Sequence, residues 1–239
     1  TMTNNKSIFI TGISRRLGLA LAHHFLDTGW EVIGTYRSER KELDALWDKG
    51  ATLYQCDFQD MDEVQDLIST VRTKHLQLRA LVHNASDWMA EGKGYPNAEV
   101  FDRMMNVHAK APYLMNMGLK DTLVGSEGEL ADIIHITDYV AARGSKKHFA
   151  YAASKAALEN LTLSFAAACA PEVKVNAVAP ALLKFNEDDD EAYKKKAVQK
   201  AVLPWEGSFE AAIEAVEYLL ASRYITGRTI HLDGGRHLK

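Results

Sequence analysis

The stretch Tyr151–Lys155, YAASK, places a phenol and an ammonium group four residues apart. On a helix, this spacing brings both side chains to one face. Because an ammonium group favours the phenolate form of a nearby tyrosine, we expect Lys155 to lower the pKa of Tyr151. A tyrosine tuned in this way can donate a proton near neutral pH. A tyrosine and a lysine at this spacing lie on the surface more often than in a catalytic site. The position of the pair in the fold must therefore decide between these two interpretations.

A second chemical feature is the glycine turn Thr11–Gly18, TGISRRLG, which follows the apolar run SIFI and precedes a helical pattern. A strand, a glycine turn and a helix in this order are typical of a dinucleotide-binding fold, in which a pyrophosphate lies at the helix N-terminus. Arg16 stands where such turns usually carry a glycine. Its guanidinium can neutralise a phosphate and donate several N–H bonds.

Apolar runs and amphipathic stretches alternate along the chain and predict an α/β fold. Most apolar runs are continuous, as in strands buried on both faces of a parallel sheet. We expect a Rossmann-type, doubly wound sheet of seven parallel strands in one domain, residues 1–239. The expected strands are Ser7–Thr11, Val32–Tyr36, Thr52–Asp57, Ala80–Asn84, Ile133–Thr137, Val173–Ala179 and Thr229–Leu232. The expected helices are Leu17–Thr28, Asp62–Lys74, Val100–Leu119, Tyr151–Ala168 and Phe209–Ala221.

Composition narrows the class of partner. Hydrophobic residues make up 47% of the 239 residues and charged residues 25%, which is typical of a soluble globular domain. A net charge of −4 gives no reason to expect nucleic acid or a membrane as a partner. Cys56 and Cys169 have no metal-ligand spacing, so we expect no metal site and two free thiols in a reducing compartment. With no leader-like or membrane-spanning apolar run, a cytoplasmic location is expected.

The glycine turn, the HNAS motif at Asn84, YAASK and TGRTIHLDGG near the end together resemble the short-chain dehydrogenase/reductase superfamily over nearly the whole chain. The resemblance implies a nicotinamide cofactor, hydride transfer, a homotetramer, and Tyr151 with Lys155 as the proton-delivering pair. The cofactor-binding residues that it implies are Gly12, Arg16, Leu17, Arg37, Ser38, Asp57, Phe58, Asn84, Ala85, Ser86, Tyr151, Lys155 and Pro180.

The end of the second strand indicates which nicotinamide cofactor is used. An NAD site carries an acid there for the ribose 2′-hydroxyl, and an NADP site accepts an arginine instead. The sequence reads VIGTYRSER, with no acid before Arg37 and Ser38. Arg37 can bind a 2′-phosphate through two N–H groups and Ser38 can add a hydroxyl, which predicts NADPH. The alternative is that Arg37 is a solvated loop residue.

Asp138, in ITDYV, stands thirteen residues before Tyr151, where the superfamily usually has a serine. A serine hydroxyl donates a hydrogen bond to a ketone oxygen, whereas an ionised carboxylate only accepts. A carboxylate would also repel a developing alkoxide. We therefore expect a nitrogen heterocycle with N–H donors rather than a ketone. The alternative is that Asp138 only caps the strand end and that Thr137 serves in its place.

Trp88, in HNASDWMAE, is an aromatic residue in the loop after the fourth strand, and it can either stack on a flat substrate ring or pack in the core. Combined with Arg16 and Asp138, it resembles the pteridine reductases of the superfamily. In that subfamily the arginine bridges the cofactor phosphates and the pterin, and the aromatic residue stacks on the pterin. The resemblance implies Asp138, Tyr151 and Lys155 as catalytic residues, and Arg16, Trp88, Asp138 and Tyr151 as substrate-binding residues.

The sequence thus predicts NADPH-dependent reduction of a 7,8-dihydropterin, with dihydrofolate as a possible second substrate. Two alternatives stay open at this point: a carbonyl reductase of the same fold, and a non-catalytic protein that binds NADP or pterin.

Two further features have open roles. His108 lies four residues before Pro112, where the superfamily has a structural or proton-relay asparagine. It can bridge water to Lys155 or pack in the core. The irregular segment 182–207 carries an acidic run followed by lysines, the pattern of a short exposed helix that complements its own dipole. We expect this segment to serve also as a substrate lid.

Overall fold

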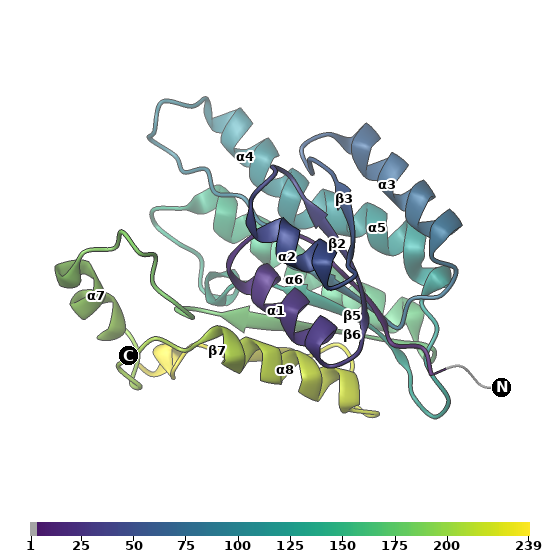
Figure 1. Cartoon of the computed structure of the whole chain (residues 1–239). Helices are drawn as coiled ribbons and strands as arrows, with labels where there is room; N and C mark the ends of the chain where they lie inside the picture. The colour runs from purple at the N-terminus through teal and green to yellow at the C-terminus, as the bar shows by residue number, and fades with distance from the viewer. Residues whose placement is uncertain (1–3) are drawn as a thin grey trace.

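The strands expected from the sequence form one parallel sheet of seven strands in a computed structural model, which describes residues 4–239. The strand order is β3-β2-β1-β4-β5-β6-β7 (Figure 1). Strands β2 and β3 are added on one side of β1, and β4 to β7 on the other side, so the strand order reverses between β1 and β4. The sheet is therefore doubly wound, which confirms the predicted architecture. The strands are β1 (Ser7–Ile10), β2 (Glu31–Tyr36), β3 (Thr52–Gln55), β4 (Ala80–His83), β5 (Ala131–Ile136), β6 (Val173–Pro180) and β7 (Thr229–Leu232).

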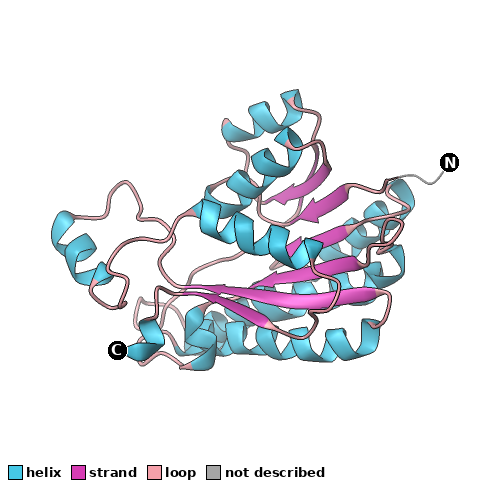
Figure 2. Cartoon of the chain, turned by 90° about the horizontal axis from the view of Figure 1, so that it is seen from below, coloured by secondary structure: helices cyan, strands magenta, loops and turns pink. Residues whose placement is uncertain are grey.

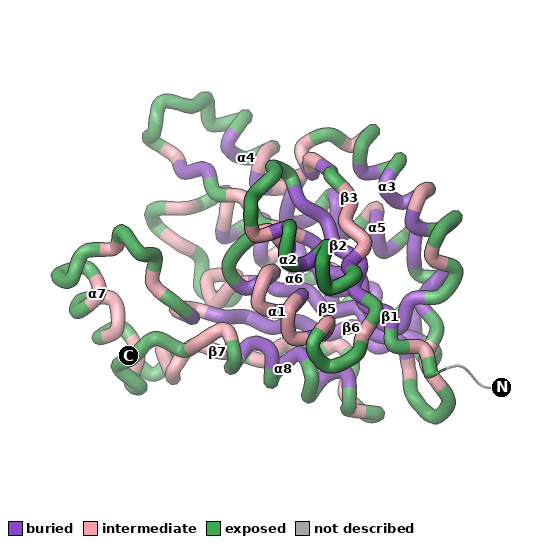
Figure 3. The backbone as a smooth tube through the Cα atoms, viewed as in Figure 1, coloured by how far each residue is buried: buried purple, intermediate pink, exposed green. Residues whose placement is uncertain are grey.

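Helices cover both faces of the sheet. One face packs against α1 (Arg16–Asp27), α2 (Glu42–Asp48) and α8 (Phe209–Ala221), and the other against α3 (Met61–Lys74), α5 (Ala111–Leu119) and α6 (Phe149–Cys169). Neighbouring strand residues point to opposite faces: Ile8 and Ile10 belong to the first cluster and Phe9 to the second. The sheet is therefore buried on both sides (Figure 3), which explains its continuously apolar strands.

Two helical details differ from the expectation. Helix α2 was not predicted, because it is only seven residues long and buries only Leu43 and Leu46. The stretch expected as one helix over Val100–Leu119 is α4 (Asn97–Met105), a π-helical turn over Asn106–Lys110, and α5. An amphipathic pattern continues through such a turn, so the pattern does not reveal it.

The carboxyl ends of the strands point towards the end of the molecule where the segment Leu182–Gly207 lies (Figure 2). This segment carries α7 (Glu191–Val198), which has no buried residue. Asp190 caps its N-terminus, where its carboxylate accepts from the Tyr193 amide at 2.7 Å. The predicted short exposed helix is thus confirmed, although most of the acidic run precedes it. Within residues 4–239, none of the helices has the length and apolar character needed to cross a membrane.

Candidate active site

The glycine turn and the loop after β4 lie in close contact at the point where the strand order reverses. The Asn84 side chain donates to the carbonyl oxygens of Thr11 and Gly12 at 3.2 and 3.0 Å. Gly12 has φ +69°, and a Cβ there would lie 2.7 Å from the Ala85 Cα. Only glycine allows this approach. Asn84, predicted to bind the cofactor, therefore holds the two loops together as well.

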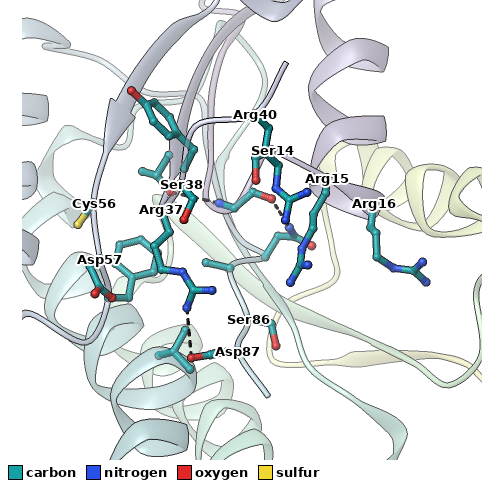
Figure 4. Close-up of a pocket in the computed structure, with 18 of the residues that line it drawn as sticks. Ser14, Arg15, Arg16, Arg37, Ser38, Arg40, Cys56, Asp57, Ser86 and Asp87 are labelled. Carbon is teal, nitrogen blue, oxygen red and sulfur yellow. Dashed lines mark hydrogen bonds and ion pairs between the residues drawn. The ribbon is translucent and has the colours of Figure 1, made fainter. Parts of the chain in front are cut away.

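A pocket opens between these loops and the ends of β2 and β3 (Figure 4). The structure brings most of the predicted cofactor residues into its lining: Gly12, Arg16, Leu17, Arg37, Ser38, Asp57, Phe58, Asn84, Ala85 and Ser86. Pro180 ends β6. The pocket is rich in cations: Arg15, in the glycine turn, and Arg40 line it together with Arg37, which follows β2. This charge suits a phosphate.

Sequence reasoning missed several lining residues, namely Ser14, Arg15, Arg40, Gln59 and Asp87. Arg15 and Arg40 could have been predicted from the sequence, since each lies within three residues of an arginine that was predicted to bind the cofactor. Asp87 could not have been predicted in this way. Its carboxylate accepts from Arg37 at 3.3 Å and from Arg103 at 3.0 Å. Arg37 thus has a partner at the pocket although it is exposed, and its predicted contact with a 2′-phosphate stays a prediction.

Asp138, Tyr151 and Lys155 meet beside this pocket, as the YAASK spacing predicts. The Tyr151 hydroxyl donates to Asp138 Oδ2 at 3.0 Å, and Asp138 Oδ1 accepts from the Val140 amide at 2.9 Å. The Lys155 ammonium donates to the carbonyl oxygen of Ile136, at the end of β5, at 3.1 Å and lies 5.8 Å from the Tyr151 ring centroid.

Asp138 thus caps a turn and also faces Tyr151, so it is more than a cap, and its predicted catalytic role stays a prediction. Thr137 is not the replacement donor, because it is buried and its hydroxyl is directed to the carbonyl oxygen of Val178, 3.4 Å away.

Burial controls the protonation of the three groups. It raises the pKa of Tyr151 well above 10, and the Asp138 carboxylate raises it further. Burial also raises the pKa of Asp138, although the Val140 amide and Lys155 oppose this. The pKa of Lys155 is lowered to about 8 by burial, against the attraction of Asp138. The expectation that Lys155 lowers the pKa of Tyr151 is wrong for this arrangement: burial and the hydrogen-bonded carboxylate dominate over a lysine that is not in contact with the hydroxyl.

His108 is a buried bridge between the cofactor pocket and α6. Its Nε2 lies 2.7 Å from the Ser86 hydroxyl and its Nδ1 lies 2.9 Å from the Ser154 hydroxyl. Ser154 in turn donates to the carbonyl oxygen of Tyr151 at 2.7 Å. Burial, with Lys155 nearby, lowers the pKa of His108 well below 6.5, so the imidazole is neutral. His108 therefore fixes Ser86 relative to the first turn of α6.

Trp88 forms an open wall beside Tyr151. Its ring centroid lies 4.7 Å from that of Tyr151 and 4.4 Å from that of His148, and 55% of the residue is exposed. A core tryptophan would be buried, so the packing alternative does not hold. The ring is thus open to solvent beside the Tyr151 phenol, and its stacking on a substrate stays a prediction.

Arg16 lies at the first turn of α1, as predicted, but its guanidinium contacts the segment Leu182–Gly207. It donates to Asn186 Oδ1 at 2.9 Å and to the carbonyl oxygen of Lys184 at 2.5 Å. Its predicted contacts with phosphate and pterin stay predictions.

The family follows from comparison with known proteins. A family profile described as enoyl-(acyl carrier protein) reductase matches residues 12–237. The chain belongs to the short-chain dehydrogenase/reductase family.

Among its relatives in this family, the dihydromonapterin reductase of Klebsiella pneumoniae is 50% identical over 98% of both chains. The dihydromonapterin reductase of Escherichia coli K12 is 49% identical over 97% of both chains.

Solved structures have the same fold. FolM alternative dihydrofolate reductase 1 from Brucella canis, complexed with NADP, is 29% identical, with a TM-score of 0.87 over 100% of this chain and 96% of that chain. A blue fluorescent protein from a metagenomic library, in complex with NADPH, is 26% identical, with a TM-score of 0.85 over 98% of both chains.

The Asp138–Lys155 coupling gives a testable titration. Since Asp138 raises the pKa of Lys155 against burial, Asp138→Asn should shift the Lys155 titration from a midpoint of about 8 to lower pH. The Lys155 ammonium then loses its proton earlier as the pH rises. The measurement is the ¹⁵Nζ shift in lysine-labelled protein, with Lys155→Met to assign the signal. Asp233→Asn, which changes a carboxylate at the end of β7, is the control and should leave the midpoint in place. An unmoved or raised midpoint in Asp138→Asn would contradict the coupling.

Proposed function

We propose that this chain is an NADPH-dependent reductase of 7,8-dihydropterins, with dihydromonapterin as the preferred substrate and dihydrofolate as a second one. The observation that carries the substrate class is the carboxylate of Asp138, which faces the reactive tyrosine at 3.0 Å. The relatives that are about half identical to this chain are named dihydromonapterin reductases, which supports the same assignment.

The cofactor assignment rests on the residues that line the pocket. Gly12 permits close backbone approach, the N-terminus of α1 favours a pyrophosphate, and the guanidinium of Arg37 with the hydroxyl of Ser38 suits a 2′-phosphate. Arg15 and Arg40 add positive charge beside them. NADPH supplies the hydride, which the ring carbon of the dihydropterin receives.

The three buried groups hold the proton and orient the substrate. Asp138 accepts a substrate N–H with a lone pair that Tyr151 and the Val140 amide leave free. Because Tyr151 keeps its proton near neutral pH, it orients a water molecule, and this water delivers a proton from the solvent to the ring nitrogen next to the reduced carbon. Lys155 is fixed by the carbonyl oxygen of Ile136 and keeps a positive charge near Asp138 below pH of about 8.

The remaining roles are assigned by position. Trp88 stacks on the pterin ring, and the segment Leu182–Gly207 closes over it as a lid.

We also propose a homotetramer, supported by the exposed apolar side chains of Tyr113 and Met117 on α5 and Leu163 on α6. The cytoplasmic location expected from the sequence stays a prediction.

Cofactor selectivity tests the role of Arg37. Arg37→Ala should reduce the preference for NADPH over NADH by about 10- to 150-fold, because a charge-assisted hydrogen-bonded pair contributes roughly 1.5–3 kcal/mol. The ratio of kcat/KM for the two cofactors measures this. Arg103→Ala is the matched control, since Arg103 shares the Asp87 carboxylate but does not line the pocket. A parental preference in Arg37→Ala would rule the assignment out.

Substrate class tests the role of Asp138. Asp138→Ser should lower kcat/KM for dihydropterin roughly tenfold or more, equivalent to about 1.4 kcal/mol, while NADPH affinity stays nearly constant. The assay is NADPH oxidation with dihydromonapterin, dihydrobiopterin, dihydrofolate and simple ketones.

Each rival function predicts its own result in that assay. A gain in ketone reduction by Asp138→Ser without loss of dihydropterin turnover would favour a carbonyl reductase. Tight NADPH binding by the parent without any turnover would favour a binding protein.

A further inference from the structure

Arg16 adopts a backbone conformation that its side chain disfavours. Its φ is +51°, in the left-handed region that glycine enters without strain. The side chain extends away from Arg15 and Arg37 in Figure 4 and reaches the segment Leu182–Gly207. A strained residue that makes two hydrogen bonds with a segment about 170 positions away in the chain has a function beyond forming the turn.

The contacted segment is held in place at its base. Glu206 accepts from the Phe185 amide at 2.9 Å, and the Gly207 amide donates to the carbonyl oxygen of Leu182 at 2.9 Å. The Arg16 guanidinium carbon and the Lys184 ammonium each lie 5.5 Å from the ring centroid of Phe209, the first residue of α8. These contacts present Lys184 and Asn186 to Arg16 while α7 beyond them stays exposed.

Both acceptors of the Arg16 bonds are neutral oxygens, one from an amide side chain and one from the backbone. The guanidinium is therefore oriented without being neutralised, in contrast to Arg37, which is paired with the Asp87 carboxylate. One N–H on each terminal nitrogen is used, so the second N–H on each and the Nε–H remain for another acceptor. Arg16 opens α1, whose N-terminus favours an anion.

We propose that Asn186 and the carbonyl group of Lys184 position Arg16, and that Arg16 couples the segment Leu182–Gly207 to the cofactor pyrophosphate. A bound pyrophosphate and the segment share one guanidinium, so each holds it in the geometry that the other needs. This coupling is reciprocal: the factor by which the segment raises cofactor affinity is the factor by which the cofactor stabilises the closed segment. The inference rests on the proposed use of NADPH.

A double-mutant cycle on NADP⁺ affinity tests the coupling. Asn186→Ala should weaken NADP⁺ binding about threefold to tenfold, as expected for one hydrogen bond that orients a charged group. In an Arg16→Gly background, the same change should have no effect. Arg16→Gly is expected to fold, because glycine adopts φ +51° without strain. Asp190→Ala is the matched control: Asp190 caps α7 in the same segment and does not contact Arg16, so NADP⁺ affinity should stay at the parental value.

Calorimetric titration gives the affinities. Equal losses from Asn186→Ala in both backgrounds would mean that Asn186 acts without Arg16, and no loss in the parent would mean that the contact does not bear on the cofactor. Either result overturns the proposal.

The rate of trypsin cleavage at Lys194–Lys196, on exposed α7, reports how firmly the segment Leu182–Gly207 is closed. NADP⁺ should slow this cleavage in the parent and in Asp190→Ala, but not in Arg16→Gly. Protection that persists in Arg16→Gly would overturn the coupling.

Failure here is distinct from failure of the proposed function. A parent that binds NADP⁺ and reduces dihydropterin but shows no coupling contradicts only this inference. A parent that binds NADP⁺ with coupling but does not reduce dihydropterin contradicts only the proposed substrate. A parent that does not bind NADP⁺ contradicts both.

Discussion

The hydrogen bond from Tyr151 to Asp138 constrains the rest of the site. Two groups that each become negatively charged on losing a proton are buried together near a lysine, and burial penalises every charged form. The favourable arrangement keeps the phenol protonated and uses the carboxylate as its acceptor. A site built in this way offers a hydrogen-bond acceptor and a neutral phenol to the substrate. Such a pair suits a nitrogen ring better than a ketone.

The fold keeps these groups in register through backbone and buried polar contacts. The carbonyl oxygen of Ile136, at the end of β5, fixes Lys155, and the neutral imidazole of His108 joins Ser86 to Ser154 in α6. Asp87 performs a similar role at the pocket mouth, where its carboxylate accepts from Arg37 and from the Trp88 amide at 2.8 Å. One acidic residue therefore contacts both Arg37, at the pocket, and the backbone of Trp88.

The fold and about half of the residues that line the pocket could be predicted, because they depend on local patterns. Continuous apolar runs predict buried parallel strands, and the glycine turn and YAASK occupy fixed places relative to those strands. The direction of the Tyr151 pKa shift could not be predicted, because it depends on how deeply the phenol is buried and on which atom Lys155 contacts. The contact between Arg16 and Asn186 depends on the path of an irregular segment. The π-helical turn that buries His108 leaves the amphipathic pattern intact and gives no sequence signal.

The protonation state of Tyr151 is the central claim, and ¹³C NMR of the tyrosine Cζ atoms measures it directly, with Tyr151→Phe to assign the signal. The titration is run on the free protein and on its NADPH complex. The account predicts that the Tyr151 phenol stays protonated up to at least pH 10 in the free protein, because burial and Asp138 both oppose ionisation. It also predicts a neutral phenol at pH 7 in the complex. A phenolate signal near pH 7 in either form would contradict the account and restore a lysine-activated tyrosine as the proton donor.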